Sequence, residues 1–399
     1  MIRYTADWVL PIADEPIRNG TVTCDGGRIV DVQAGLGSDA VRLGRAAILP
    51  SLVNAHTHLE LSYLRGVVSP SERFLDWIRA VMATRREYPD AADPVIVRAA
   101  QSAIDEARAS GTGLVGDVSN TLVTVPLLRD GRMPAHVFYE LIGFSVADPD
   151  KRVAEARAKV REAGPGDSVR ISLAPHAPYS VSPALFSAIR ADIDGESAVS
   201  TVHLGESRDE VEFLRTGTGG WRALLEEIGA WNAGWEAPGR SPAEYLADIG
   251  FLDSRVLAVH GVQCSGEDLS KLRALGVTIV SCPRSNQYVG VGSPPIEAFY
   301  AMDVTVAFGT DSLASVEDLN IFSELAEARR IAPRVPARDL LESATLSGAR
   351  ALGFESELGS IEAGKRASLI AVRIPEGVDD VEEHLLSGIE PEMIRWLAE

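Results

Sequence analysis

From about residue 47 onward the chain alternates short apolar β-runs with amphipathic helical stretches, and this alternation limits the possible fold more than any other feature. A helix between two strands returns the chain to the same edge of a sheet, which is how parallel strands are connected. The β-runs lie at 47–53, 113–118, 135–141, 169–174, 199–203, 256–260, 277–282 and 304–309. Between them lie helical stretches such as 72–87, 95–109, 150–162, 183–191, 242–249, 267–275 and 318–331. Eight strand–helix units in succession predict an α/β fold of the (β/α)8 TIM-barrel type. The alternative is a doubly wound open sheet, but no glycine-rich dinucleotide-binding motif follows any of these runs.

The two ends of the chain have a different pattern. Residues 1–45 hold short apolar segments separated by turn signals, which is typical of a β-meander. Residues 358–372 return to short β-runs that can pair with this meander. We therefore expect a small composite β-sandwich domain from residues 1–47 and 354–399, and a barrel domain from residues 48–353. Residues 216–240 contain three tryptophans and several glycines, and they predict a lid or insertion over the barrel mouth.

Composition and charge exclude several classes of partner. The formal net charge is −19, so the chain repels phosphate backbones and we expect no nucleic-acid binding. The three cysteines, Cys24, Cys264 and Cys282, have no paired spacing and predict reduced thiols in a cytoplasmic protein. The N-terminal residues lack a signal-peptide pattern, and no apolar run approaches the roughly 20 residues of a membrane span. A homodimer is the default expectation for the assembly.

Two histidines end the first β-run, in the stretch Asn54-Ala-His56-Thr-His58. Side chains two residues apart on a strand point to the same side, whereas on a helix they would lie on nearly opposite faces. A strand that ends in His-x-His therefore directs two imidazoles at one point, as binding of a first-row metal ion requires.

Five further polar residues lie at or just after the ends of later β-runs: His176, His203, Glu206, His260 and Asp311. In a (β/α)8 barrel the carboxyl ends of the strands form the active face. Each residue alone has an ordinary structural explanation. A histidine at a strand end is more often a satisfied core residue than a ligand, His176 lies in a proline-flanked loop, Glu206 suits a first helical turn, and Asp311 suits a turn or N-cap. The convergence of all five on one face favours a metal-centred site.

These residues belong to a series of short motifs whose order resembles the amidohydrolase superfamily. The motifs are Asn54-Ala-His-Thr-His-Leu59, Pro175-His-Ala-Pro-Tyr179, His203-Leu-Gly-Glu206, Val259-His-Gly261, Cys282-Pro-Arg-Ser-Asn286 and Gly309-Thr-Asp-Ser312. Within the superfamily the chain is similar to the mononuclear-metal deaminases of adenosine, S-adenosylhomocysteine and methylthioadenosine and to their chlorohydrolase relatives. It is most similar to the aminodeoxyfutalosine deaminases, a resemblance that spans nearly the whole chain and implies a role in menaquinone biosynthesis.

The resemblance implies a role for each polar residue. One divalent metal ion, with zinc as the first expectation and iron or manganese as alternatives, would be bound by His56, His58, His203 and Asp311. Glu206 would shuttle protons, and His260 would orient the attacking water beside the metal, so the catalytic set is Glu206, His260 and Asp311. The substrate would be contacted by His176, Tyr179, Ser285 and Asn286.

Two departures from the family pattern bear on the substrate. Ser281 stands where many relatives have a histidine, and residues 84–88 contain arginines where nucleoside deaminases have a ribose-binding glutamate. We expect Arg86, or its neighbour Arg85, and Arg284 at the pocket mouth, since arginine suits bidentate capture of a carboxylate. The alternative places the helical arginines on a solvated face and Arg284 as a brace for a loop. With the resemblance, the arginines predict a 6-aminopurine nucleoside that bears a distal anionic or aromatic group, the best candidate being 6-amino-6-deoxyfutalosine, converted to futalosine.

The implied reaction is hydrolytic deamination, in which a carbon–nitrogen bond of a cyclic amidine is cleaved and ammonia is released. An amine leaves well only when it is protonated, so an acid such as Glu206 is needed, whereas displacement of a halide needs much less acid catalysis. The alternatives are another metallohydrolase of the superfamily, such as an S-adenosylhomocysteine, methylthioadenosine or guanine-type deaminase, a chlorohydrolase or a cyclic amidase, and a non-catalytic ligand-binding barrel. The intact Glu206 disfavours the last of these.

Overall fold

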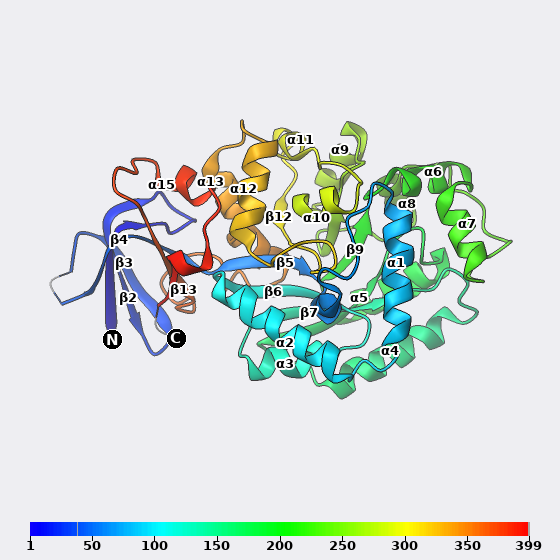
Figure 1. Cartoon of the computed structure of the whole chain (residues 1–399), viewed down its shortest axis with the longest axis horizontal. Coiled ribbons are helices and arrows are strands. Elements are labelled where there is room, and N and C mark those ends of the chain that lie inside the picture. Colours follow the sequence, from blue (N-terminus) through cyan, green and yellow to red (C-terminus); the bar gives the residue numbers. More distant parts are fainter. Residues whose placement is uncertain (38, 398–399) are drawn as a thin grey trace.

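Both ends of the chain meet in one mixed sheet of six strands, at one side of a larger α/β body (Figure 1). The structure is a computed structural model that describes residues 1–37 and 39–397. The strands of this terminal sheet follow the order β14-β13-β4-β1-β2-β3. Their bounds are β1 (Ile2–Val9), β2 (Ile17–Asp25), β3 (Arg28–Ala34), β4 (Val41–Pro50), β13 (Leu369–Arg373) and β14 (Ile394–Trp396).

The expected pairing of the chain ends is confirmed, because β13 runs antiparallel to β4. One face of the terminal sheet buries a small apolar cluster that includes Tyr4, Val22, Ile48 and Leu369. Burial of this cluster holds the two ends of the chain together, since each end alone has too little apolar surface to fold.

The predicted β-run 47–53 is wrong as a single strand. Its first part belongs to β4, which ends at Pro50, and its last part belongs to β5 (Leu52–Thr57) in a different sheet. Ser51 marks the change, where its backbone N–H donates to the carbonyl of Ser368 at 2.9 Å. Both parts are buried, so the apolar run continues through the change and the sequence pattern does not reveal it.

The α/β body contains two four-stranded parallel sheets, β5-β6-β7-β8 and β9-β10-β11-β12. The remaining bounds are β6 (Thr112–Ser119), β7 (Ala135–Leu141), β8 (Val169–Pro175), β9 (Ser200–Leu204), β10 (Val256–His260), β11 (Thr278–Ser281) and β12 (Val306–Phe308). Apart from the first, every predicted β-run agrees with a strand to within two residues at each end.

The two parallel sheets adjoin at both edges, with β8 beside β9 and β12 beside β5. Within the described ranges, separate hydrogen bonds rather than a regular strand ladder join the sheets at these seams. At the first seam, Ser200 Oγ donates to the carbonyl of Leu173 at 2.9 Å. At the second seam, Asn54 Nδ2 donates to Thr310 Oγ1 at 2.8 Å, and Thr310 N–H donates back to Asn54 Oδ1 at 3.1 Å. We call this reciprocal pair the Asn54–Thr310 clasp.

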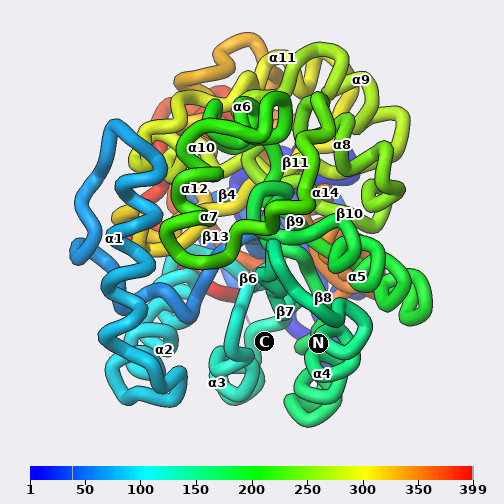
Figure 2. The backbone as a smooth tube through the Cα atoms, turned by 90° about the vertical axis from the view of Figure 1, so that its right-hand side faces the viewer, coloured from blue at the N-terminus to red at the C-terminus, as the bar shows by residue number. Residues whose placement is uncertain are grey.

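Helices lie around the strands, as the end-on view shows (Figure 2). The helices that correspond to predicted stretches are α1 (Phe74–Glu87), α2 (Pro94–Ala109), α4 (Pro149–Ala163), α5 (Pro183–Glu196), α8 (Pro242–Asp248), α9 (Gly266–Ala274) and α12 (Ile321–Ile331). Four of them begin with proline directly after an Asp or Ser whose side chain caps the helix, which is a strong start signal in sequence.

Several shorter helices were not predicted, because segments of five to nine residues carry too little periodicity. They are η1 (Leu59–Leu64), α3 (Thr124–Asp130), α6 (Arg208–Thr216), α7 (Gly220–Glu227), α10 (Pro283–Tyr288), α11 (Ile296–Ala301), α13 (Ala337–Ser343), α14 (Leu346–Ala351) and α15 (Val381–Leu385), together with the single turn η2 (Pro391–Met393).

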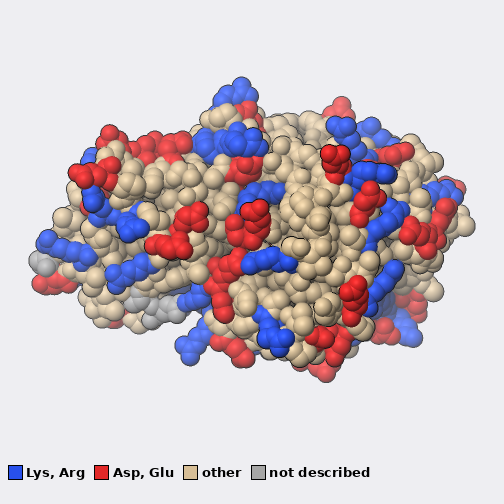
Figure 3. Space-filling view, viewed as in Figure 1, with Lys and Arg blue, Asp and Glu red and all other residues tan. Residues whose placement is uncertain are grey.

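Acidic and basic side chains are interspersed over the face of the molecule seen in Figure 3, so the net charge of −19 forms no large patch on that face. None of the helices in residues 1–37 and 39–397 combines the length and the apolar character that a bilayer crossing needs.

The Asn54–Thr310 clasp should contribute measurably to stability. Both side chains are fully buried, so the Asn54→Ala change leaves Thr310 N–H without its acceptor in the protein interior. We expect a loss of about 2–4 kcal/mol in the free energy of unfolding, because each unsatisfied buried group costs about 1–3 kcal/mol. The midpoint of urea unfolding, followed by tryptophan fluorescence, measures this loss.

The exposed Asn232 gives a matched control, and Asn232→Ala should change the free energy of unfolding by less than about 0.5 kcal/mol. Equal midpoints for the two variants would contradict the role of the clasp.

Candidate metal centre and catalytic cavity

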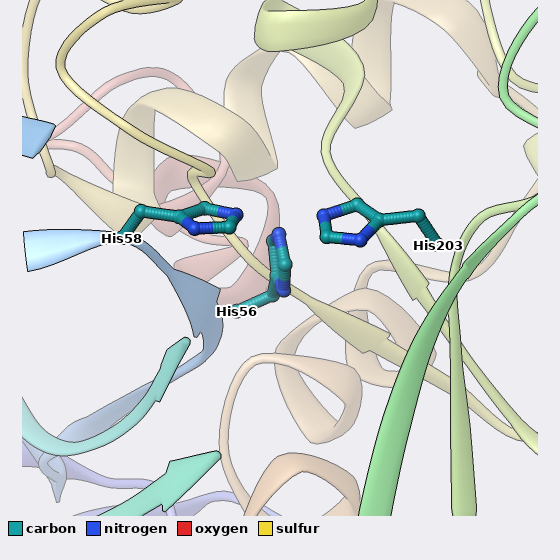
Figure 4. Close-up of side chains that lie close together, drawn as sticks. All are labelled: His56, His58 and His203. Carbon is teal, nitrogen blue, oxygen red and sulfur yellow. The ribbon is translucent and has the colours of Figure 1, made fainter. Parts of the chain in front are cut away.

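Three histidines point at one another from two different strands (Figure 4). His56 lies near the end of β5, His58 follows directly after this strand, and His203 comes from β9 on the opposite sheet. One ring nitrogen of each lies within 4.8 Å of the corresponding nitrogens of the other two. The geometry expected for the His-x-His strand end is therefore present, and the third histidine faces it across the space between the sheets.

Asp311 completes this cluster from the segment after β12. Its Oδ1 lies 3.8 Å from His56 Nε2 and 3.6 Å from His58 Nε2. Its Oδ2 accepts hydrogen bonds from Ser285 Oγ at 2.6 Å and from Ser315 Oγ at 3.2 Å. The backbone of Asp311 has φ +62°, a left-handed conformation that a non-glycine residue adopts only where the surroundings hold it.

The donor atoms of the cluster fit a divalent metal ion. His56 is completely buried, and neither of its ring nitrogens has a hydrogen-bond partner among the described residues. A buried imidazole without a partner is costly, and a metal ion on Nε2 would satisfy it. His203 Nδ1 lies 3.0 Å from the carbonyl of His176, so Nδ1 carries the proton and Nε2 keeps its lone pair for a metal.

Burial also keeps these histidines neutral, which is the form that binds metals. It lowers the pKa of His56 and of His58 well below the usual value, and the neighbouring imidazoles lower both further. Three neutral imidazoles and one carboxylate form a donor set that zinc and similar first-row ions accept.

Glu206 and His260 face each other beside the cluster, with His260 Nε2 3.5 Å from Glu206 Oε1. Burial raises the pKa of Glu206 well above its usual value, and the nearby carboxylates of Asp311 and Glu210 raise it further. Glu210 fixes the turn that carries Glu206, because its carboxylate accepts hydrogen bonds from Glu206 N–H at 2.9 Å and Gly205 N–H at 3.0 Å. The cavity therefore holds a carboxyl group whose pKa is raised by burial and whose backbone turn is held in one position.

The cluster lies at the base of a cavity of about 380 Å³. Two helices supply most of its apolar walls, α1 with residues such as Trp77 and Met82 and α7 with Leu224 and Leu225. A volume of this size and a mostly apolar lining with a few convergent polar groups are typical of small-molecule sites.

The predicted lid segment 216–240 contains α7 and forms one wall of the cavity. Trp221 of α7 stacks on Tyr179, with ring centroids 3.6 Å apart and planes 14° apart. Trp235 stacks on Phe213 in the same way, at 4.6 Å and 3°. Aromatic packing therefore anchors both ends of the segment, and its motion stays a prediction.

Only some of the predicted substrate-contacting residues line the cavity. His176 and Tyr179 do. Ser285 and Asn286 do not: Ser285 donates to Asp311, and Asn286 Nδ2 lies 2.9 Å from His260 Nδ1, so both contact residues of the site from behind, and their contact with substrate stays a prediction.

The arginines predicted at the pocket mouth differ in where they lie, and their contact with substrate stays a prediction. Arg284 is turned away from the cavity, because its guanidinium is paired with both carboxylate oxygens of Asp318 at 2.8 and 3.0 Å. Arg86 is exposed on α1 and lines a shallower hollow next to the cavity together with Arg152. Its neighbour Arg85 does line the cavity, where it donates to Asn120 Oδ1 at 3.1 Å.

Sequence reasoning missed Glu140, which is 5% exposed and lines the cavity at the end of β7. The signal was available, because Glu140 stands near the C-terminal end of the predicted β-run 135–141, where the other site residues were sought. Asn120 was missed as well, and it donates from Nδ2 to Glu140 Oε2 at 2.8 Å.

Comparisons with known proteins agree with this geometry. The aminodeoxyfutalosine deaminase of Deinococcus radiodurans is 33% identical over 323 residues, which cover 77% of this chain and 74% of that protein. The 5-methylthioadenosine/S-adenosylhomocysteine deaminase of Moorella thermoacetica is 30% identical over 382 residues, which cover 91% of this chain and 83% of that protein.

Two crystal structures have similar folds over almost the whole chain. An adenosine deaminase of Xanthomonas campestris with bound zinc has a TM-score of 0.84 at 27% identity, covering 98% of this chain and 90% of that one. The Helicobacter pylori aminofutalosine deaminase in complex with methylthio-coformycin has a TM-score of 0.85 at 25% identity, covering 97% and 95%. The model of the amidohydrolase family matches residues 47–389, a range that contains every residue of the cluster, and the chain therefore belongs to the amidohydrolase family.

Proposed function

We propose that this protein is a metal-dependent deaminase of an adenosine-like nucleoside, with 6-amino-6-deoxyfutalosine as the first candidate substrate. The observation that carries the proposal is the pair formed by Glu206 and His260, 3.5 Å apart and buried beside the three-histidine cluster. A metallohydrolase that releases a halide has less need of a buried carboxylic acid at this place.

In this proposal His56, His58, His203 and Asp311 hold one divalent ion, and zinc is favoured because the Xanthomonas campestris structure holds zinc. When bound, such an ion lowers the pKa of water and makes a hydroxide nucleophile available near neutral pH. Ser285 and Ser315 fix the carboxylate of Asp311 through its Oδ2, which leaves Oδ1 directed at the histidines.

The protein supplies the proton chemistry. Burial favours the protonated form of Glu206, and in that form it can donate to the ring nitrogen next to the amino-bearing carbon as that carbon is attacked. The carboxylate then takes the proton of the attacking water and passes it to the departing amine, which leaves as ammonia. His260 is held by Asn286 on Nδ1, so its Nε2 stays directed at Glu206 and can position the attacking water.

The walls of the cavity bear on the rest of the substrate. The apolar faces of α1 and α7 suit an aromatic or thioether group, and Arg85 places one cation among them. The Deinococcus radiodurans relative favours aminodeoxyfutalosine, while the Moorella thermoacetica relative makes methylthioadenosine or S-adenosylhomocysteine the second candidate.

We also propose that the eight strands β5–β12 form one closed barrel, since the two sheets adjoin at both edges. Residues 1–47 and 354–399 would form the accessory β-domain and residues 48–353 the catalytic domain. A homodimer stays the expected assembly, and light scattering after size-exclusion chromatography tests it.

The first prediction concerns the metal. Purified wild-type protein should contain one divalent ion per chain, and His203→Ala should lose most of it, because the variant removes one of four ligands. Elemental mass spectrometry measures the metal content per chain. His384→Ala is a matched control on α15, outside the cluster, and should retain the metal. Equal metal content in the two variants would remove His203 from the ligand set.

The second prediction concerns Glu206. The Glu206→Gln variant should keep its metal but lose at least about 10²-fold in kcat, the usual contribution of a general acid–base residue. Ammonia release under saturating substrate measures kcat. Glu212→Gln changes an exposed glutamate of α6 and should have near-normal turnover. Near-normal turnover by Glu206→Gln would assign proton transfer to another residue.

The third prediction concerns the substrate. Among 6-amino-6-deoxyfutalosine, methylthioadenosine, S-adenosylhomocysteine and adenosine, the first should have the highest kcat/KM and adenosine the lowest. The reason is that adenosine has no distal group to contact the apolar walls and Arg85 of the cavity. Steady-state ammonia release over the four compounds ranks them. Adenosine as the best substrate, or faster turnover of guanine or a triazine, would contradict the proposal.

A further inference from the structure

One buried acid of the cavity has no part in the proposed proton chemistry. Three carboxylates line the cavity: Asp311, Glu206 and Glu140. Asp311 lies 3.6 Å from His58 of the cluster, and Glu206 lies 3.5 Å from His260 beside the cluster. Glu140 lies apart from them at the end of β7, and a carboxylate buried in a cavity wall needs donors for both of its oxygens.

Only one of these two oxygens has its donor. Glu140 Oε2 accepts a hydrogen bond from Asn120 Nδ2 at 2.8 Å. Oε1 accepts none from the residues that the structure describes. The nearest ring nitrogen, His203 Nδ1, lies 3.6 Å away and already donates to the carbonyl of His176 at 3.0 Å. Oε1 is not sealed off inside the protein either, so it faces the cavity as a free acceptor.

The position of Oε1 relates it to a particular part of a ligand. Oε1 lies beside Nδ1 of His203, 3.6 Å away, so the ring of His203 stands between Oε1 and the centre of the cluster. His176 lies on the same side, with its ring centroid 4.9 Å from that of His203 and its Nδ1 held by Ser180 Oγ at 2.6 Å. In an aminopurine nucleoside the sugar is attached on the side of the bicyclic base opposite the amino group, so it would reach this region.

A second metal ion fits Oε1 poorly, although Glu140, His176 and His203 lie close enough together to hold one. One nitrogen of His203 donates to a carbonyl and the other faces the first cluster. Only two protein ligands would remain, fewer than a structural or catalytic ion normally has.

A cationic group of the ligand is also a poor partner for Glu140 Oε1. Arg85 already places a positive charge one side chain away, because its guanidinium donates to Asn120, which in turn donates to Glu140. A neutral hydroxyl donor satisfies Oε1 without bringing a second cation next to this arginine, and hydrogen bonds from hydroxyls to a carboxylate are short and strong.

We infer that Glu140 selects for the sugar of the substrate, with Oε1 accepting hydrogen bonds from the vicinal ribose hydroxyls. The inference rests on the proposed nucleoside deaminase function and adds a specificity-determining residue to it. Asn120 is a positioning residue in this arrangement, since it fixes the carboxylate through Oε2.

The test compares a nucleoside that has the ribose hydroxyls with one that lacks them, each with the wild type and with a variant that lacks the Glu140 carboxylate. The kcat/KM values for adenosine and for 2′,3′-dideoxyadenosine are measured with metal-loaded wild type and with Glu140→Gln. For the wild type we expect a preference for adenosine of about 10- to 100-fold, the usual value of hydrogen bonds to a charged group. For Glu140→Gln the preference should fall to about threefold or less, because the amide is a weaker acceptor.

Two further variants make the comparison specific. Glu60→Gln changes a neighbouring buried carboxylate that pairs with Arg85 at 3.4 Å but does not line the cavity, so it should retain the wild-type preference. Glu140→Asp keeps the charge and withdraws it by one methylene group, so it should lose the preference. Glu140→Asp thus also tests the inference if Glu140→Gln does not fold.

Each outcome has one meaning. An equal preference for adenosine in the wild type and in the folded Glu140 variants overturns the inference. Loss of metal from Glu140→Gln with an unchanged preference also overturns it, and shows that Glu140 supports His203 instead. Absence of ammonia release from every nucleoside with the wild type overturns the proposed function, and the role of Glu140 with it.

Discussion

The connection between the first and last strands of the α/β body brings the four ligands of the candidate metal site together. Asp311 N–H donates to the carbonyl of His56 at 3.0 Å, and Thr57 Oγ1 donates to the carbonyl of Asp311 at 2.9 Å. These bonds and the Asn54–Thr310 clasp bring together residues more than 250 positions apart in sequence. Without these bonds the Asp311 carboxylate would not lie within 4 Å of the imidazoles of His56 and His58, and the candidate ligands would not converge on one point.

A second layer of side chains then fixes three residues of the candidate site, each by a specific contact. Asn286 holds His260, Ser285 holds Asp311, and Glu210 holds the turn before Glu206. The backbones of His260 and Asp311 have φ values of +79° and +62°, an uncommon conformation for residues with side chains. Strain of this kind at strand ends is typical of sites whose geometry is set by function and supported by the surrounding packing.

Sequence periodicity was sufficient to predict where most strands and longer helices lie, because each strand is a buried apolar run and several helices carry a Pro and a capping side chain at the start. The cluster was also predictable, since its histidines lie at strand ends.

The direction in which individual side chains point was not predictable from the sequence. Arg284 turns to Asp318, 34 residues later, and only the folded loop reveals that partner. The boundary between β4 and β5 at Ser51 could not be predicted, because the residues on both sides of it are buried. The role of Glu140 depends on which of its oxygens Asn120 occupies, a detail that no sequence pattern records.

The single residue Ser51 between β4 and β5 makes the terminal sheet and the strand of the His-x-His motif one nearly continuous backbone segment. Both β1 and β14 belong to that sheet, which lies at the opposite end of the molecule from α7 and the cavity (Figure 1). An affinity tag, a fused partner or a surface linker at either terminus would therefore point away from the cavity mouth. The same arrangement suits immobilisation of the enzyme on a sensor surface, where substrate must reach the cavity freely from solution.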